Sequence, residues 1–132
     1  MNIKRSKIDI VIATSNLGKL KEFRQLFVNL PFNAIPQPEG IQIEETGMTF
    51  AENASLKALA VAKKNKNWVL ADDSGLMVDE LNGAPGIYSS RYANSDNERV
   101  QKLLRELGNC LNRKARFVSS LCIAEGSRVL LE

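Results

Sequence analysis

The stretch LADDSGLMVDELNGAPGIYSSRY, from Leu70 to Tyr92, decides both the fold and the position of the site. Residues 68–70 form an apolar run that is typical of a short buried strand. Residues 72–75, two aspartates, a serine and a glycine, carry turn chemistry, so we expect them to interrupt the strand before the apolar residues 76–78 resume it. Because open α/β sheets bind ligands at strand ends, two adjacent carboxylates at this point predict a cation site.

The chain on the N-terminal side of this stretch reads as a strand, a loop and a helix. Residues 8–13 are a β-branched apolar run, and Leu20, Phe23, Leu26, Phe27 and Leu30 recur at helical spacing after them. Pro31 is expected to end this helix. The proline-rich residues 36–40 are then expected to connect to a short strand at residues 41–43.

Two further helices begin at capping patterns. Thr49 with Glu52 predicts one helix start, and Ser95 with Glu98 predicts another, which Gly108 would end. The expected buried residues of the first helix are Ala51, Ala54, Ala58, Val61 and Ala62, and the second helix carries the apolar residues Val100, Leu103, Leu104 and Leu107. Residues 115–124 predict a strand, followed by a turn and a returning strand from residue 128. This order predicts an α/β fold with flanking helices.

Composition restricts the function classes. The length of 132 residues suits one domain, and a formal charge of +3 is too small an excess to predict a nucleic acid partner. Histidine is absent, which excludes Ser-His and Cys-His nucleophilic machinery and a His-ligated zinc site. Catalysis would therefore depend on carboxylates, lysines and a cation with oxygen ligands.

Cysteine usage and the N-terminus predict the cellular compartment. Cys110 and Cys122 lack zinc-finger spacing, so we interpret them as reduced packing thiols. The basic residues Lys4, Arg5 and Lys7 precede an apolar run that is too short for an export signal, and nothing has the length needed to cross a bilayer. We therefore expect a cytoplasmic protein without a membrane partner.

Three segments resemble one family and follow its order along the chain. They are TSNLGKLKEF at 14–23, EETGMTFAENASLKA at 44–58, and ADDSGL with VDELNGAPGIYSSRYA at 71–93. Together they resemble the inosine triphosphate pyrophosphatase family, also called the Ham1 family. The resemblance implies an ITPase-like mixed central sheet, an architecture similar to that of anticodon-binding domains. It also implies a homodimer and magnesium-dependent hydrolysis of ITP, dITP or XTP to the monophosphate and pyrophosphate.

The resemblance implies a triphosphate-binding loop formed by Thr14, Ser15, Asn16, Leu17, Gly18 and Lys19. A loop between a strand and a helix N-terminus favours phosphate physically. It is not a Walker A loop, and on its own such a turn is usually only a helix cap and a connection. A P-loop kinase is not indicated.

The remaining site residues are also assigned by resemblance. Glu45 and Asp73 would bind Mg²⁺, Asp73 would also be the general base, Lys57 would contact the phosphates and Ser74 would contact the substrate. Without the resemblance, a pair of acids at residues 44–45 is typically solvated, and Lys57 could be an ordinary surface lysine. Arg91 could reach phosphate or a partner subunit. Asp72 and Asp73 would repel each other if both ionise, and magnesium would relieve that repulsion.

The family resembled also carries FGYDP and SHR segments that bind the purine base, and neither occurs in these 132 residues. We therefore expect a single domain, residues 1–132, that is incomplete at its C-terminus, discriminates little between ITP and ATP, and pairs its apolar final strand in an assembly. The alternative is a non-catalytic module that binds triphosphate. Turnover distinguishes the two.

Overall fold

The computed structural model describes residues 6–132, so Lys4 and Arg5 lie outside the described residues. Within them, one five-stranded sheet is formed by β1 (Ile8–Ile12), β2 (Phe32–Pro36), β3 (Trp68–Val78), β4 (Ala115–Glu125) and β5 (Arg128–Leu131). The spatial order is β2-β1-β3-β4-β5. The first three strands along this order are parallel, and β4 and β5 add antiparallel pairs. The predicted mixed sheet is confirmed.

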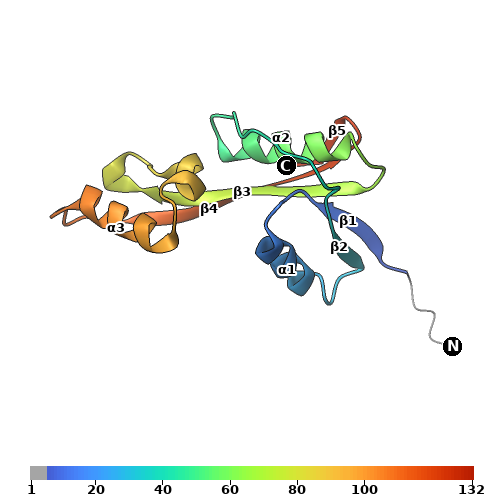
Figure 1. Cartoon of the computed structure of the whole chain (residues 1–132), viewed down its shortest axis with the longest axis horizontal. Coiled ribbons are helices and arrows are strands. Elements are labelled where there is room, and N and C mark those ends of the chain that lie inside the picture. The colour runs from blue at the N-terminus through green and yellow to red at the C-terminus, as the bar shows by residue number, and fades with distance from the viewer. Residues whose placement is uncertain (1–5) are drawn as a thin grey trace.

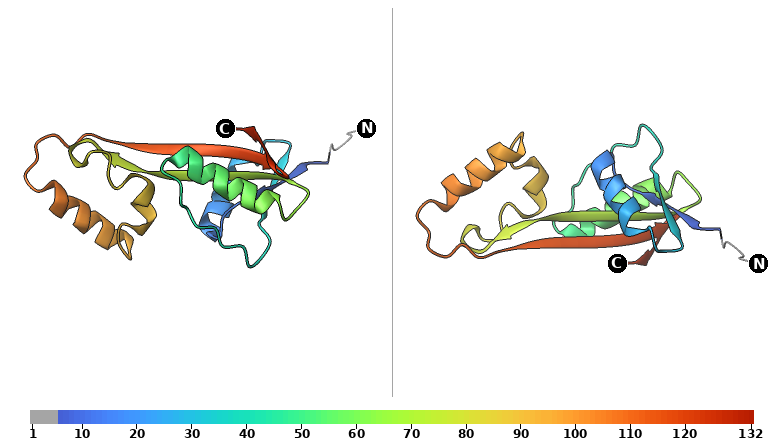
Figure 2. Two further views of the ribbon diagram at one scale, coloured as in Figure 1. Left: turned by 90° about the horizontal axis from the view of Figure 1, so that it is seen from above. Right: turned by 90° about the horizontal axis from the view of Figure 1, so that it is seen from below.

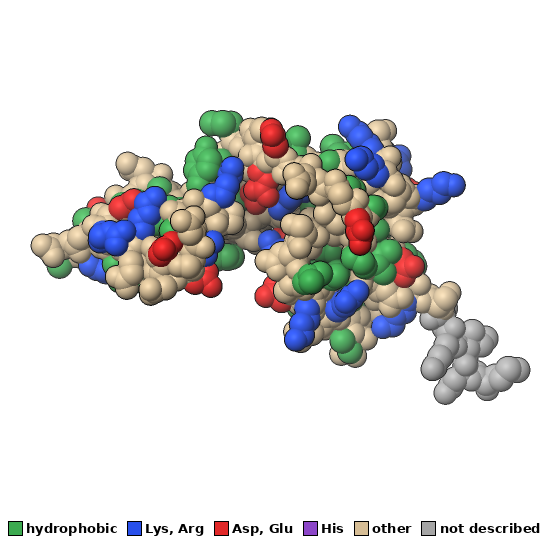
Figure 3. Space-filling view, viewed as in Figure 1, with side chains coloured by type: hydrophobic (Ala, Val, Ile, Leu, Met, Phe, Trp, Pro, Cys, Tyr) green, Lys and Arg blue, Asp and Glu red, His purple; other side chains and the backbone are tan. Residues whose placement is uncertain are grey.

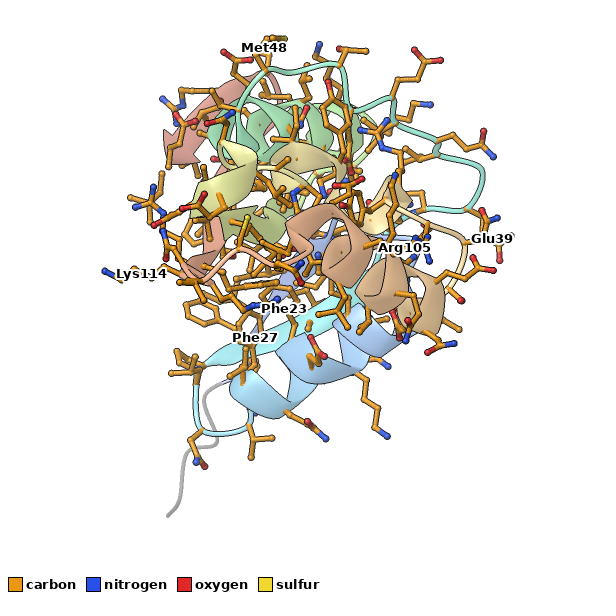
Figure 4. All side chains as sticks on the ribbon, turned by 90° about the vertical axis from the view of Figure 1, so that its left-hand side faces the viewer. Phe23, Phe27, Glu39, Met48, Arg105 and Lys114 are labelled. Atoms are coloured by element: carbon orange, nitrogen blue, oxygen red, sulfur yellow. The ribbon has the colours of Figure 1, made fainter. Side chains whose placement is uncertain are left out.

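Helices cover both faces of the sheet (Figure 1). The helices within residues 6–132 are α1 (Leu17–Leu26), α2 (Phe50–Ala62), α3 (Asp96–Leu107) and the short 3₁₀ segments η1 (Asp79–Leu81) and η2 (Gly86–Arg91). α2 packs one core cluster against β3 and β4, while α1 packs another against β1 and β2. Figure 4 looks along the long strands and shows Phe23 and Phe27 of α1 between that helix and the sheet.

The strands β3 and β4 are longer than the others and carry the chain away from α1 and α2. They pair continuously from Val69 with Ala124 to Val78 with Ala115. At their far end lie η1, η2 and α3, so the molecule is elongated (Figures 1 and 2). In α3, Leu107 is buried, whereas Val100 and Leu104 are 53% and 47% exposed. The apolar side chains of this helix are therefore only partly covered by the rest of the described chain.

Both predicted capping patterns are present. Thr49 accepts a hydrogen bond from the Glu52 N–H at 3.1 Å, and Ser95 accepts one from the Glu98 N–H at 3.2 Å. Gly108 ends α3 with a φ of +52°, a conformation that glycine adopts without steric cost. These helix ends could be predicted from the sequence because each cap forms its hydrogen bond with a residue only three positions away.

The prediction that residues 72–75 interrupt the strand is wrong. They lie inside β3 because β4 pairs with each of them, from Asp72 with Leu121 to Gly75 with Val118. A side chain at Gly75 would collide with the Gly86 carbonyl oxygen and stand 2.5 Å from Ser89 Oγ. The glycine thus allows η2 to cross the strand closely, a role that its turn chemistry did not reveal.

Two boundary predictions also change. Helix α1 ends at Leu26, before Pro31, and the chain forms β2 at Phe32–Pro36, where no strand was predicted. The expected strand at residues 41–43 is absent from the described chain; Ile41 and Ile43 instead pack their side chains on the core without a paired backbone. Pairing with β1 decides which apolar segment becomes a strand.

Among residues 6–132, none of the helices combines the length and apolarity that a bilayer crossing requires.

Candidate functional site

The loop between β1 and α1 is organised by one side chain. Asn16 Oδ1 accepts the N–H groups of Gly18 at 2.9 Å and Lys19 at 3.3 Å, and the Asn16 N–H donates to Thr14 Oγ1 at 3.1 Å. Asn16 is therefore the N-cap of α1, which is the local interpretation of this motif. Its neighbours Ser15 and Leu17 are exposed.

The two aspartates of β3 lie on opposite faces of the sheet, because successive strand residues alternate. Asp72 Oδ2 lies 2.9 Å from Lys19 Nζ and accepts the Ser74 hydroxyl at 3.0 Å, on the α1 side. Asp73 Oδ1 lies 3.8 Å from Lys57 Nζ, on the α2 side. The predicted repulsion between adjacent aspartates is therefore wrong.

The carboxylate that does influence Asp73 is Glu45. Its Oε1 lies 3.3 Å from the same Lys57 Nζ, so one ammonium group contacts both acids. Burial of Asp73 raises its pKa above the usual value, and the negative charge of Glu45 raises this pKa further. Lys57, the Asn53 side chain and Lys19 act in the opposite direction. Carboxylates with perturbed pKa values are frequent at functional sites.

The donor set on the α2 side fits magnesium. Asp73 Oδ2 is buried and lacks a hydrogen-bond partner among the described residues, so it has free capacity as an acceptor. Nowhere in residues 6–132 do three or more His, Cys, Asp or Glu side chains gather in a way that could hold a metal. Two carboxylates are nevertheless enough for Mg²⁺ when phosphate oxygens and waters complete its shell.

An open cleft of about 850 Å³ lies beside these groups. One wall is the loop with Thr14, Ser15, Asn16 and Leu17, another is the segment 36–45, and Lys57 and Glu45 also line it. Figure 3 shows acidic and basic side chains side by side in the hollow at the middle of the molecule. The cleft opens where the parallel strand β1 ends.

Arg91 lies at a second cleft, of about 490 Å³, which it lines together with Glu44 and Glu45. Its guanidinium lies 5.4 Å from the centroid of the Tyr88 ring. Arg91 is thus near one predicted metal ligand but outside the lining of the larger cleft.

Sequence reasoning missed two parts of the site. Asn53 is completely buried beside Asp73, although its spacing of four residues from Lys57 on α2 placed both on one helix face. The segment 36–40, which we interpreted only as a connection, forms part of a wall of the larger cleft. No periodicity marks such a wall in the sequence.

The fold and this polar cleft define an α/β protein with a candidate anion and cation site at the carboxyl ends of its parallel strands. The sequence profile of the Ham1 family matches residues 10–131, and the chain therefore belongs to the Ham1 family. Both the family and the fold expected from the sequence motifs are confirmed.

The chain is 60% identical to a dITP/XTP pyrophosphatase of Synechococcus sp. over an alignment of 115 residues. This alignment covers 87% of this chain and 56% of the relative. It is 55% identical to a dITP/XTP pyrophosphatase of Prochlorococcus marinus, covering 95% of this chain and 64% of the relative. Among solved structures, a Ham1 protein of Coxiella burnetii matches with a TM-score of 0.84 and 42% identity, covering 93% and 68% of the two chains. The chain thus spans roughly three fifths of the length of these curated relatives.

Proposed function

We propose that this chain carries the catalytic residues of a pyrophosphatase that hydrolyses ITP, dITP and XTP to the monophosphate and pyrophosphate. The observation that carries the proposal is the buried Asp73 carboxylate, flanked by Glu45 and Lys57, in a chain 60% identical to a protein named dITP/XTP pyrophosphatase. Such an activity removes deaminated purine nucleotides before they enter nucleic acid.

Asp73 is the proposed general base. Its Oδ2 has no competing hydrogen bond within residues 6–132, so it can accept the proton of a water molecule that attacks a phosphate. Its raised pKa makes it a stronger base than an exposed aspartate. Histidine is absent from the sequence, and the Asp72 carboxylate that accepts the Ser74 hydroxyl is paired with Lys19 at 2.9 Å, so we do not propose Ser74 as the nucleophile.

The two lysines are the proposed phosphate contacts. Lys19 and Lys57 extend from α1 and α2, and each has three N–H donors, so each can bind a phosphate oxygen while it contacts its carboxylate. Thr14, Ser15, Asn16 and Leu17 line the cleft in which the triphosphate would lie, and Gly18 belongs to the same loop. Ser74 and Lys19 both contact Asp72. Arg91, which lines the second cleft with Glu45, is a proposed further contact.

Glu45 and Asp73 are the proposed ligands of Mg²⁺, which when bound would neutralise charge on the phosphate oxygens. The homodimer implied by the family resemblance and the cytoplasmic location expected from the cysteines and the N-terminal residues stay predictions.

The purified chain, incubated with magnesium and a panel of purine NTPs, tests the proposal through pyrophosphate release. Pyrophosphate and monophosphate in equal amounts from ITP, dITP or XTP are the expected products, and omission of magnesium is expected to abolish them. Binding of triphosphate without turnover would instead identify a non-catalytic binding module.

A further inference from the structure

We propose that Asn53 is a positioning residue that fixes the loop bearing Glu45 against the strand bearing Asp73, so that the two carboxylates can share one divalent cation. The inference deepens the proposed function and rests on it. It assigns a role to a side chain that neither catalysis nor phosphate binding uses.

The first contact joins Asn53 to the loop. Its Oδ1 accepts the Gly47 N–H at 2.7 Å, two residues after Glu45. A side chain at Gly47 would stand 2.7 Å from Asn53 Oδ1 and 2.8 Å from Glu52 Cβ, so the loop approaches α2 as closely as a glycine permits. The position of Glu45 therefore depends on the Asn53 amide.

The second contact surface faces the strand. Asn53 Nδ2 and Asp73 Oδ2 are both buried and both lack a hydrogen-bond partner among the described residues. One is a donor and the other an acceptor, and the Asn53 side chain lowers the pKa of Asp73, so the amide lies close to this carboxyl. Each carboxylate oxygen has two lone pairs, so Asp73 Oδ2 can face the Asn53 amide and still accept a cation or a proton. The Asn53 amide thus accepts a hydrogen bond from the loop with its oxygen and has its nitrogen available on the Asp73 side.

The helix that carries Asn53 is rigidly seated. Asn53 is 0% exposed, and Ala54, Ala58 and Val61 on α2 are also fully buried against the sheet. Lys57, one turn further along α2, contacts both Glu45 and Asp73. Because α2 cannot shift without disturbing this core, Asn53 offers a fixed reference point between a loop without regular structure and a paired strand.

The test measures binding of Mn²⁺ alone to the 132-residue chain by electron paramagnetic resonance, since Mn²⁺ prefers the same oxygen ligands as Mg²⁺. Asn53→Leu keeps the branching and the number of heavy atoms of the side chain but removes both polar atoms, and we expect it to weaken Mn²⁺ binding about 10-fold or more, the usual effect of losing a group that orients a ligand. The matched control is Asn65→Leu on the next turn after α2. Asn65 also accepts a backbone N–H, that of Asn67 at 2.8 Å, and donates to the Val61 carbonyl at 2.7 Å.

Asn65→Leu is expected to bind Mn²⁺ like the parent, within about twofold. If Asn53→Leu also binds like the parent, Asn53 has only a packing role and the proposal is overturned, while the proposed function stands. If the parent itself does not bind Mn²⁺, the cation site is rejected together with this proposal, and the pyrophosphate assay decides the proposed function separately.

A second variant keeps the proposal testable if Asn53→Leu does not fold. Gly47→Ala leaves Asn53 in place but forces the loop away from it, and we expect a similar loss of Mn²⁺ affinity. Circular dichroism melting establishes that each variant is folded. Since both changes break the same contact, the double variant is expected to bind no more weakly than the weaker single variant; fully additive losses would contradict the shared contact.

Discussion

The two faces of β3 each carry one buried aspartate, and these two aspartates differ in their hydrogen-bond and ion-pair partners. Asp72 and Asp73 have equally buried side chains, each 9% exposed. Asp72 is satisfied by Lys19 at 2.9 Å and by the Ser74 hydroxyl at 3.0 Å. Asp73 has a lysine only at 3.8 Å, which it shares with Glu45, and one of its oxygens lacks a partner among the residues described. Burial alone therefore does not distinguish the two acids.

The difference teaches which carboxylate stabilises the fold and which is held ready for a ligand. A buried acid with close partners repays its desolvation, whereas one with unused acceptor capacity and a raised pKa destabilises the protein until a ligand binds. Such local conflict with stability is common where proteins bind or react.

The largest expected effect concerns turnover. Asp73→Asn keeps the shape of the side chain but removes its basicity and charge, so we expect pyrophosphate release to fall about 100- to 10,000-fold. Asp72→Asn is the matched control on the other face and is expected to lose about 10-fold or less, through Lys19 alone. Equal losses in the two variants, measured with ITP and magnesium, would remove the distinction between the faces.

The next effect concerns substrate binding by the lysines of the two faces. Lys19→Ala and Lys57→Ala each remove one charged donor, worth roughly 1.5–3 kcal/mol, which is about a 10- to 100-fold loss of triphosphate affinity. Calorimetric titration with non-hydrolysable ITP and ATP analogues should show the same loss for both, because a charge on phosphate carries no base information. An altered purine preference at unchanged affinity would contradict the phosphate role.

A smaller effect separates the faces by stability at neutral pH. Asp72→Asn weakens a buried ion pair and is expected to lower the free energy of unfolding by about 1–3 kcal/mol. Asp73→Asn removes a charge that burial and Glu45 disfavour, so we expect no loss or a gain of up to about 1 kcal/mol. Urea denaturation of the metal-free proteins measures both; a larger loss for Asp73→Asn would reverse the assignment.

The smallest effect is the pH dependence of that stability. Between the usual value of 3.8 and the raised pKa of Asp73, the folded protein binds more protons than the unfolded chain. The contribution of Asp73 is therefore most favourable below pH 3.8 and is lost as the pH rises through the folded-state pKa, by at most about 1.4 kcal/mol per pH unit. Subtracting the Asp73→Asn curve from the parent curve isolates this slope, and a difference of opposite sign would show that the pKa is lowered.

Much of the fold follows from the sequence because its signals are local. The strand at residues 8–13, the caps Thr49 and Ser95, and the final hairpin all depend on neighbours within a few residues, and all are present. What failed depends on distant pairing: β2 exists because β1 lies beside it, and residues 72–75 stay extended because β4 pairs with them. Propensity cannot anticipate such partners.

The candidate site was predicted by motif rather than by geometry. Lys57 Nζ lies 3.3 Å from Glu45 and 3.8 Å from Asp73, while Lys19 contacts Asp72, and the roles of these residues stay predictions. The sequence assigned no role to Asn53, although its spacing places it on the same helix face as Lys57. Only the alternation of β3 and the fold of the loop from Glu45 to Gly47 determine these neighbours.

The consecutive placement of the two aspartates also makes the length of β3 a functional property. Suppose that one residue between Val69 and Asp72 is removed while Val69 stays paired with Ala124. Each later side chain of β3 would then move to the other face of the sheet. Ser74 would then stand where Asp73 meets Lys57, and Asp73 would take the place of Asp72 beside Lys19. Insertions and deletions in this strand would therefore exchange the chemistry of its two sides without altering any of the site residues themselves.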